Sequence, residues 1–151
     1  QTYYKEPNSK NGILNYNVIN AKARELMEEF DVRGAGELIA GGDLSGGNQQ
    51  KAVIAREIDR DPELLIVSQP TRGLDVGAIE YIRKRIIAER DKGKAVIVVS
   101  FELDEILDMS DRIAVIYDGA IQGILDPAET NKQDLGILMA GGQLNKEEAN
   151  V

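Results

Sequence analysis

Ser45, Gly46 and Gly47 precede a segment, residues 52–58, whose apolar side chains recur at helical spacing. A serine at this position can cap the helix with its hydroxyl, and glycines let backbone N–H groups approach a ligand closely. The start of a helix also has unsatisfied N–H donors and the positive end of the helix dipole. The arrangement is typical of a phosphate site, although on spacing alone a plain glycine turn before a capped helix fits equally well.

The residues that follow point to a specific family. Residues 44–51 read LSGGNQQK, residues 64–70 read LLIVSQP, residues 70–75 read PTRGLD, and residues 98–103 read VVSFEL. In order and spacing these segments resemble the signature motif, Walker B strand, D-loop and switch-histidine segment of the ATP-binding-cassette (ABC) ATPases. The wording PTRGLDVGAIE and SFELDEIL is most similar to the second ATPase half of importers for nucleosides or simple sugars.

The resemblance implies a shared nucleotide site. In this family two ATPase domains meet with ATP between them, and one domain offers its signature motif to ATP held by the other. Ser45, Gly46 and Gly47 would then contact the γ-phosphate, and Gln49 would contact the ribose. Asp75 would lie at the domain interface, serve as the N-cap of the next helix, or do both. Both ATP and Mg²⁺ would be held by the partner domain.

The residues that hydrolyse ATP in this family are missing or replaced. No Gly-x-x-x-x-Gly-Lys-Ser/Thr phosphate loop occurs in the sequence, so the donors that hold the β- and γ-phosphates are absent from it. Ser68 and Gln69 occupy the places of the Walker B aspartate and glutamate, and Phe101 that of the histidine. Serine has no charge for Mg²⁺, an amide cannot take a proton from water, and phenylalanine offers no hydrogen bond. The resemblance therefore implies degenerate catalytic positions beside an intact signature.

Composition limits the remaining possibilities. The chain has 151 residues, 42% of them hydrophobic and 29% charged, with a net charge of −8, no cysteine and no histidine. This net charge argues against nucleic acid as a partner, because nucleic acid binds to a basic face. Disulfides and thiolate metal sites are excluded, and no apolar run approaches the ~20 residues of a membrane span. By resemblance we expect a cytoplasmic protein, peripheral on the inner face of the membrane, and a piece of a longer chain.

The hydrophobic patterns predict an α/β fold. Strands are expected over 63–68, 95–100 and 113–117, with a hairpin arm over 121–125, and helices over 18–30, 45–60, 76–90, 102–109 and 127–139. We divide the chain into a flexible lead-in (1–15), a helical subdomain with the signature helix (16–60), a partial RecA-like core (61–141) and a polar tail (142–151). The resemblance implies a partial P-loop NTPase fold, whose parallel sheet is incomplete because the phosphate-loop strand is absent.

Three functions are compatible with these observations. The resemblance implies a partial nucleotide-binding domain of an ABC importer, from the carboxy-terminal part of the second ATPase half. Its partners would be the first nucleotide-binding domain of the same polypeptide and the membrane permease subunits. A non-catalytic docking module that retains the fold is the alternative, but such a module has no need for an intact LSGG. A stand-alone ATPase is disfavoured by the missing phosphate loop.

Overall fold

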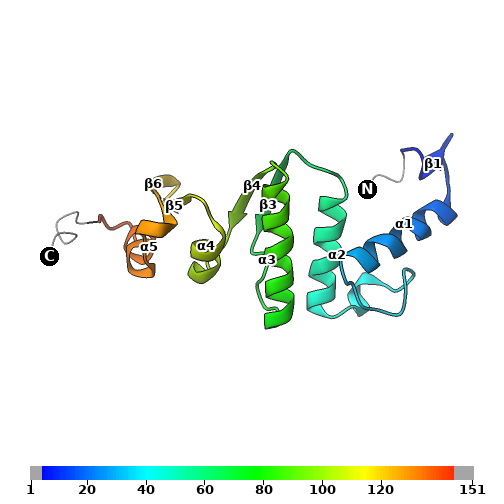
Figure 1. Ribbon diagram of the computed structural model, residues 1–151, viewed down its shortest axis with the longest axis horizontal. Coiled ribbons are helices and arrows are strands. Elements are labelled where there is room, and N and C mark those ends of the chain that lie inside the picture. The colour runs from blue at the N-terminus through cyan, green and yellow to red at the C-terminus, as the bar shows by residue number, and fades with distance from the viewer. Residues whose placement is uncertain (1–4, 145–151) are drawn as a thin grey trace. The chain divides into compact units, whose positions relative to one another are not determined.

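The computed structural model describes residues 5–144, which fold into a mixed α/β structure (Figure 1). Within these residues lie five α-helices and three two-stranded sheets. The chain divides into two compact units, residues 1–65 with 70–97 and residues 66–69 with 98–151. No helix in the described part of the chain is both long and apolar enough to cross a membrane.

Three capped helices build the first unit. They are α1 (Tyr16–Glu29), α2 (Gly46–Ile58) and α3 (Val76–Asp91), and a 3-10 turn (Gly41–Asp43) precedes α2. Each begins after a side-chain cap: Asn15, Ser45 and Asp75, respectively. The expected start of the first helix at residue 18 is wrong by two residues, because the side chain of Asn15 accepts the N–H of Val18 and α1 begins at Tyr16.

The lead-in predicted as flexible contains a short hairpin. Strands β1 (Ser9–Lys10) and β2 (Ile13–Leu14) pair antiparallel. Asn11 and Gly12 connect them with φ angles of 52° and 79°, as a two-residue type I′ turn requires. Residues 5–15 are therefore structured, and residues 1–4 of the predicted lead-in lie outside the described part of the chain.

Strands β3 (Leu64–Ser68) and β4 (Ala95–Val99) form the predicted parallel pair. The first residue of β4 donates its N–H to the carbonyl of Glu63 at 3.0 Å, and Gln69 donates to the last carbonyl of β4 at 2.8 Å. Because the start of one strand pairs with the start of the other, the two run in the same direction.

The pair β3–β4 is covered on one face only. Leu65 and Val67 are buried. The alternate positions carry exposed apolar side chains, namely Leu64, Ile66, Ile97 and Val99. Among the described strands β4 pairs with β3 alone, and β5 pairs with β6 alone. The expectation of an incomplete sheet is therefore confirmed.

The second unit has an antiparallel hairpin packed against helices. It contains α4 (Leu103–Met109), β5 (Ile113–Tyr117), β6 (Ala120–Leu125) and α5 (Lys132–Met139). Its core is formed by Ile113, Val115, Leu135 and Leu138. A turn at Asp118–Gly119, with φ angles of 47° and 74°, connects β5 to β6.

The predicted helix over 127–139 is interrupted. A 3-10 turn spans Pro127–Glu129, and α5 starts only at Lys132. The side chain of Asn131 accepts the backbone N–H groups of Gln133 and Asp134, and the Asp134 side chain accepts the N–H of Asn131. This capping box favours a new helix start over continuation of the preceding turn.

The core of the first unit fixes how α2 lies. Apolar side chains from the turn that follows α1, from the inner face of α2 and from α3 are buried: Phe30, Val32, Ile54, Ala55, Ala78, Ile82 and Ile86. Figure 1 shows α2 running alongside α3, and the two helices are in contact. The start of α2 is therefore presented by a packed helix, and not by a loose loop.

Candidate functional site

Ser45 caps α2, as the sequence predicts. Its Oγ accepts the backbone N–H of Asn48 at 3.5 Å and the side-chain amide of Asn48 at 3.0 Å. Ser45 and Gly46 are exposed, and nothing lies within 4 Å of the position that a Gly46 Cβ would take. The first N–H groups of a helix have no acceptor inside the helix, so a group of donors faces solvent here.

Gly47 has a structural reason to be glycine. A Cβ at this position would lie 3.2 Å from the Cβ of Ala78 and 3.6 Å from Oδ2 of Asp75. Both residues belong to the start of α3, so the signature segment and the segment that resembles a D-loop are in direct contact. The close approach of two helices therefore explains this glycine without any ligand.

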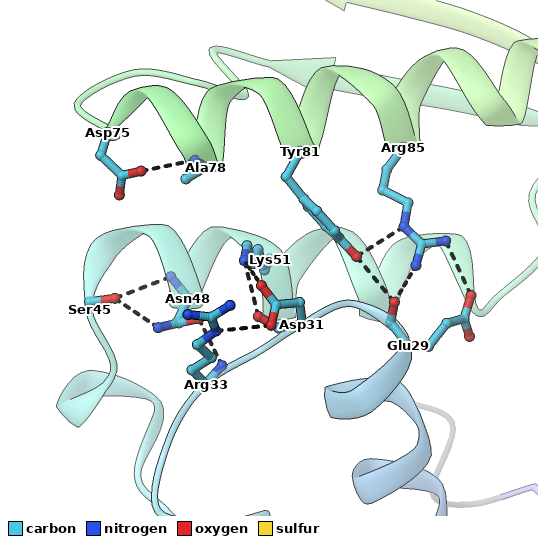
Figure 2. Close-up of polar contacts among 10 residues, drawn as sticks. All are labelled: Glu29, Asp31, Arg33, Ser45, Asn48, Lys51, Asp75, Ala78, Tyr81 and Arg85. Atoms are coloured by element: carbon cyan, nitrogen blue, oxygen red, sulfur yellow. Dashed lines mark hydrogen bonds and ion pairs between the residues drawn. The ribbon is translucent and has the colours of Figure 1, made fainter.

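Asp75 caps α3. Its Oδ1 accepts the N–H of Ala78 at 2.9 Å. Figure 2 shows Asp75 and Ser45 at the same end of the two neighbouring helices. The N-cap reading is therefore confirmed, whereas a direct contact between this carboxylate and a phosphate would bring two negative charges together.

Gln49, predicted to contact a ribose, folds back on its own loop. Its Nε2 donates to the carbonyl of Leu44 at 2.8 Å. The side chain is exposed, and Oε1 is the atom of its amide that this bond leaves to accept a hydroxyl.

Ser68, Gln69 and Phe101 lie in the second unit. Gln69 has a φ of 50°, a conformation that non-glycine residues seldom adopt. Its N–H is bound to the last carbonyl of β4. The side chain of Phe101 is 72% exposed. Within residues 5–144 no three acidic, histidine or cysteine side chains form a cluster that could hold a metal ion.

The residues that hold α2 in place were not predicted from the sequence. Helix α1 ends in a Schellman motif, in which the N–H of Val32 donates to the carbonyl of Met27 at 2.8 Å and that of Asp31 to the carbonyl of Glu28 at 3.2 Å. Asp31 adopts a φ of 49°. The chain then turns toward α2, where the N–H of Arg33 donates to Oδ1 of Asn48 at 2.8 Å (Figure 2).

Lys51 is the second attachment of this turn to α2. Its buried ammonium donates to the carboxylate of Asp31 at 2.7 Å and to the carbonyl of the same residue at 3.1 Å. It also lies 4.6 Å from the centre of the Tyr81 ring, within cation–π range. Hydrogen bonds from Lys51 and Arg33 hold the pKa of Asp31 below its usual value.

Arg85 and Tyr81 of α3 bind the end of α1. Both donate to the carbonyl of Glu29, Tyr81 at 3.2 Å. The guanidinium of Arg85 also lies 4.4 Å from the centre of the Phe30 ring and donates to the Tyr81 hydroxyl at 3.0 Å. A cation at the carboxyl end of a helix complements its dipole, so α1, α2 and α3 are tied together by polar contacts as well as by their core.

Comparison with known proteins gives close relatives. The chain is 74% identical over 146 residues to the nucleoside import ATP-binding protein NupA of Lactococcus lactis subsp. cremoris, covering 97% of this chain and 29% of NupA. It is 57% identical over 141 residues to the guanosine import ATP-binding protein NupO of Bacillus subtilis, covering 93% of this chain and 28% of NupO. The chain thus spans less than a third of the length of these relatives. No protein-family model matches it.

Solved structures share the fold. A post-hydrolysis dimer of the ATP-binding cassette MJ0796 bound to ADP and Pi matches with a TM-score of 0.65 and 24% identity, over 78% of this chain and 51% of that one. An ATP-binding subunit of an ABC transporter matches with a TM-score of 0.67 and 18% identity, over 84% of this chain and 56% of that one. Together with the import ATP-binding proteins, these matches show that the chain belongs to the ATP-binding-cassette ATPase family and corresponds to part of such a protein.

Proposed function

We propose that this chain supplies the signature motif to ATP held by a partner ATPase domain of an importer. The observation that carries the proposal is the exposed, capped start of α2, where Ser45 and Gly46 face solvent. The hydroxyl of Ser45 and the N–H groups of Gly46 and Gly47 are donors that a terminal phosphate can accept, and the dipole of α2 adds a favourable field.

The residues present fit only part of an ATP site. They offer donors to a phosphate, and Gln49 offers an exposed amide to a ribose. The sequence contains no phosphate loop, so the β- and γ-phosphates and the Mg²⁺ would be held by the partner domain. Bound ATP would supply the negative charge that these donors recognise, and this chain would orient its terminal phosphate.

The catalytic positions support a one-sided division of labour. Ser68 and Gln69 have no carboxylate to hold a cation or to take a proton from water. The exposed ring of Phe101 cannot donate a hydrogen bond to a phosphate. We therefore propose that hydrolysis depends on the catalytic residues of the partner domain, and that this chain contributes Ser45, Gly46, Gly47 and, at the domain interface, Asp75.

The relatives support nucleosides as the solute. Identity is 74% and 57% for the two nucleoside import proteins, and it falls to 49% for a glucose import protein of Haloferax volcanii and to 41% for a ribose import protein of Lacticaseibacillus paracasei. We propose as partners the first nucleotide-binding domain of the same polypeptide and the membrane permease subunits, at the cytoplasmic face of the membrane.

The test is ATP hydrolysis by the full-length protein in the assembled transporter. Ser45→Arg and Gly46→Asp place a large cation or a like charge where the phosphate would lie. We expect either change to lower the rate of ATP hydrolysis about 10- to 100-fold, because this is the effect of losing one or more hydrogen bonds to a charged group. Gly46 is preferable to Gly47 for this test, because a side chain at Gly47 would also press on Ala78.

Gln69→Glu is the matched control. It restores one carboxylate in a catalytic site that still lacks the aspartate and the histidine. We therefore expect the rate of ATP hydrolysis to change less than about twofold. A larger effect from Gln69→Glu than from the two signature variants would reverse our assignment of active and inactive sites. If the halves associate equally well with ATP and with ADP, the docking module is the better description.

A further inference from the structure

The side chain of Asn48 lies between Ser45 and the turn after α1 (Figure 2). The N–H of Arg33 donates to Oδ1 of Asn48 at 2.8 Å, and Nδ2 of Asn48 lies 3.0 Å from Oγ of Ser45. A backbone N–H can only donate, so the atom of Asn48 facing Arg33 must be the carbonyl oxygen. The amide orientation is therefore fixed, and Asn48 presents an N–H to Ser45.

This orientation determines what the Ser45 hydroxyl can do. A hydroxyl oxygen has two acceptor positions and one donor hydrogen. The two acceptor positions face the side-chain and backbone N–H groups of Asn48, at 3.0 and 3.5 Å. The hydroxyl hydrogen must then point away from Asn48, and since Ser45 is exposed, it points toward solvent or toward a ligand.

We propose that Asn48 is a positioning residue that keeps Ser45 a hydrogen-bond donor toward the terminal phosphate of ATP. The proposal rests on the proposed function, because Ser45 is assumed to contact that phosphate. We call this chain of hydrogen bonds the relay. It runs from the backbone N–H of Arg33 through the side chain of Asn48 to the hydroxyl of Ser45, which faces outward. The simpler role of Asn48, a tether between α2 and the turn at Arg33, predicts different variant behaviour.

Asn48→Asp separates the two roles. An aspartate keeps an oxygen for the N–H of Arg33, so the tether is retained. Its second oxygen can only accept, so the Ser45 hydroxyl turns its hydrogen inward and becomes an acceptor on its outward side. Asn48→Ala loses the tether, yet it leaves the hydroxyl free to turn outward. The relay predicts that Asn48→Asp is the more harmful variant, whereas the tether predicts that Asn48→Ala is.

The experiment measures ATP-dependent closure of the two ATPase halves in the full-length protein, by energy transfer between two fluorescent labels. For Asn48→Asp we expect the ATP concentration at half-closure to rise about tenfold or more, as for a lost hydrogen bond to a charged group. For Asn48→Ala the expected rise is about threefold. Thermal unfolding of each variant without nucleotide reports on the tether alone.

A second background removes the effect of the added charge. In Ser45→Ala the relay has no outward end, so adding Asn48→Asp should raise the half-closure concentration by less than about twofold further. An equal effect of Asn48→Asp in both backgrounds would mean charge repulsion and would overturn the relay. A greater loss for Asn48→Ala than for Asn48→Asp would also overturn it.

Failure of the proposed function gives a different pattern. If Ser45→Ala itself leaves closure unchanged, Ser45 does not contact the phosphate, and the relay falls together with that function. If Ser45→Ala weakens closure while Asn48→Asp does not, the function stands and the relay alone is wrong. If Asn48→Asp fails to fold, Asn48→Ala decides, since a loss larger than that of Ser45→Ala contradicts the relay.

Discussion

The ammonium of Lys51 binds Asp31 twice, at 2.7 Å through the carboxylate and at 3.1 Å through the backbone carbonyl. Lys51 is buried, while Asp31 is partly exposed at the end of α1. A lysine without an acceptor at this position would leave a buried charge. The pair therefore fastens the end of α1 to the middle of the signature helix.

Asp31→Asn should remove a pH-dependent part of the stability. Lys51 and Arg33 hold the pKa of Asp31 below its ordinary value of 3.8. A carboxyl whose pKa is lowered on folding stabilises the protein above its unfolded pKa, and the contribution is lost as the pH falls through the folded pKa. The variant should thus be less stable than the wild type above about pH 4 and equal to it at the lowest pH, as measured by urea unfolding of the full-length protein.

Glu80→Gln provides the comparison for this measurement. Glu80 and Lys84 form an ion pair at 2.6 Å on the outside of α3, and both side chains are well exposed. Exposed pairs of this spacing contribute little to stability, because solvent and salt screen the attraction. The difference in free energy of unfolding between Asp31→Asn and the wild type should shrink strongly as the pH falls. The corresponding difference for Glu80→Gln should shrink much less. Parallel curves for Asp31→Asn and wild type would contradict the assignment.

Gly46→Ala and Gly47→Ala should differ in stability although they are neighbours. A Cβ at Gly46 meets nothing within 4 Å, whereas at Gly47 it lies 3.2 Å from Ala78. Overpacking between two helices costs about 1–3 kcal/mol, while alanine favours the helix by about 1 kcal/mol over glycine. We expect Gly46→Ala to be neutral or stabilising and Gly47→Ala to be about 1 kcal/mol less stable than Gly46→Ala by chemical denaturation. Equal stabilities would show that α2 and α3 separate easily.

Asp75→Asn and Asp75→Ala should separate capping from charge. Asparagine caps a helix about as well as aspartate, and alanine at an N-cap costs about 1 kcal/mol. The free energy of unfolding of Asp75→Asn should therefore lie within about 0.5 kcal/mol of the wild-type value. That of Asp75→Ala should lie about 1 kcal/mol below the wild-type value. If Asp75→Asn is stable but lowers ATP hydrolysis in the transporter, the charge of Asp75 acts at the domain interface. An unchanged rate would leave Asp75 as a cap alone.

The amide hydrogens of β4 should exchange faster in the 151-residue chain than in the full-length protein. Among the described strands β4 pairs with β3 alone, and one face of this pair exposes Leu64, Ile66, Ile97 and Val99. An open apolar face and a free edge favour association with other chains. Hydrogen exchange with light scattering tests this, and a strictly monomeric chain whose β4 is as protected as in the full-length protein would refute it.

Sequence patterns predicted the elements whose signals are local. The caps Ser45 and Asp75 were each recognised from residue type and position, and the structure confirms them. The hairpin at Asn11–Gly12 was missed, although the Asn-Gly pair is a strong signal for such a turn. The surrounding residues are mostly polar, and this composition favoured the prediction of a flexible segment over that of a hairpin.

The supports of the signature helix could not be predicted in the same way. Asp31 and Lys51 are twenty residues apart, and Tyr81 lies thirty residues further on. Only the packing of α1, α2 and α3 brings them together, and no spacing rule relates them. The contact between Gly47 and Ala78 could not be predicted from the sequence either, because it also depends on how the helices pack. In addition, a glycine beside a serine already has a sufficient local explanation.

That contact has a mechanical consequence. A Cβ at Gly47 would lie only 3.2 Å from the Cβ of Ala78, so we expect a shift of the start of α2 toward α3 to displace residues 75–78 as well. If the two segments are coupled in this way, a partner that binds around Asp75 would change the affinity for an anion at Ser45 by the same factor by which the anion changes the affinity for that partner.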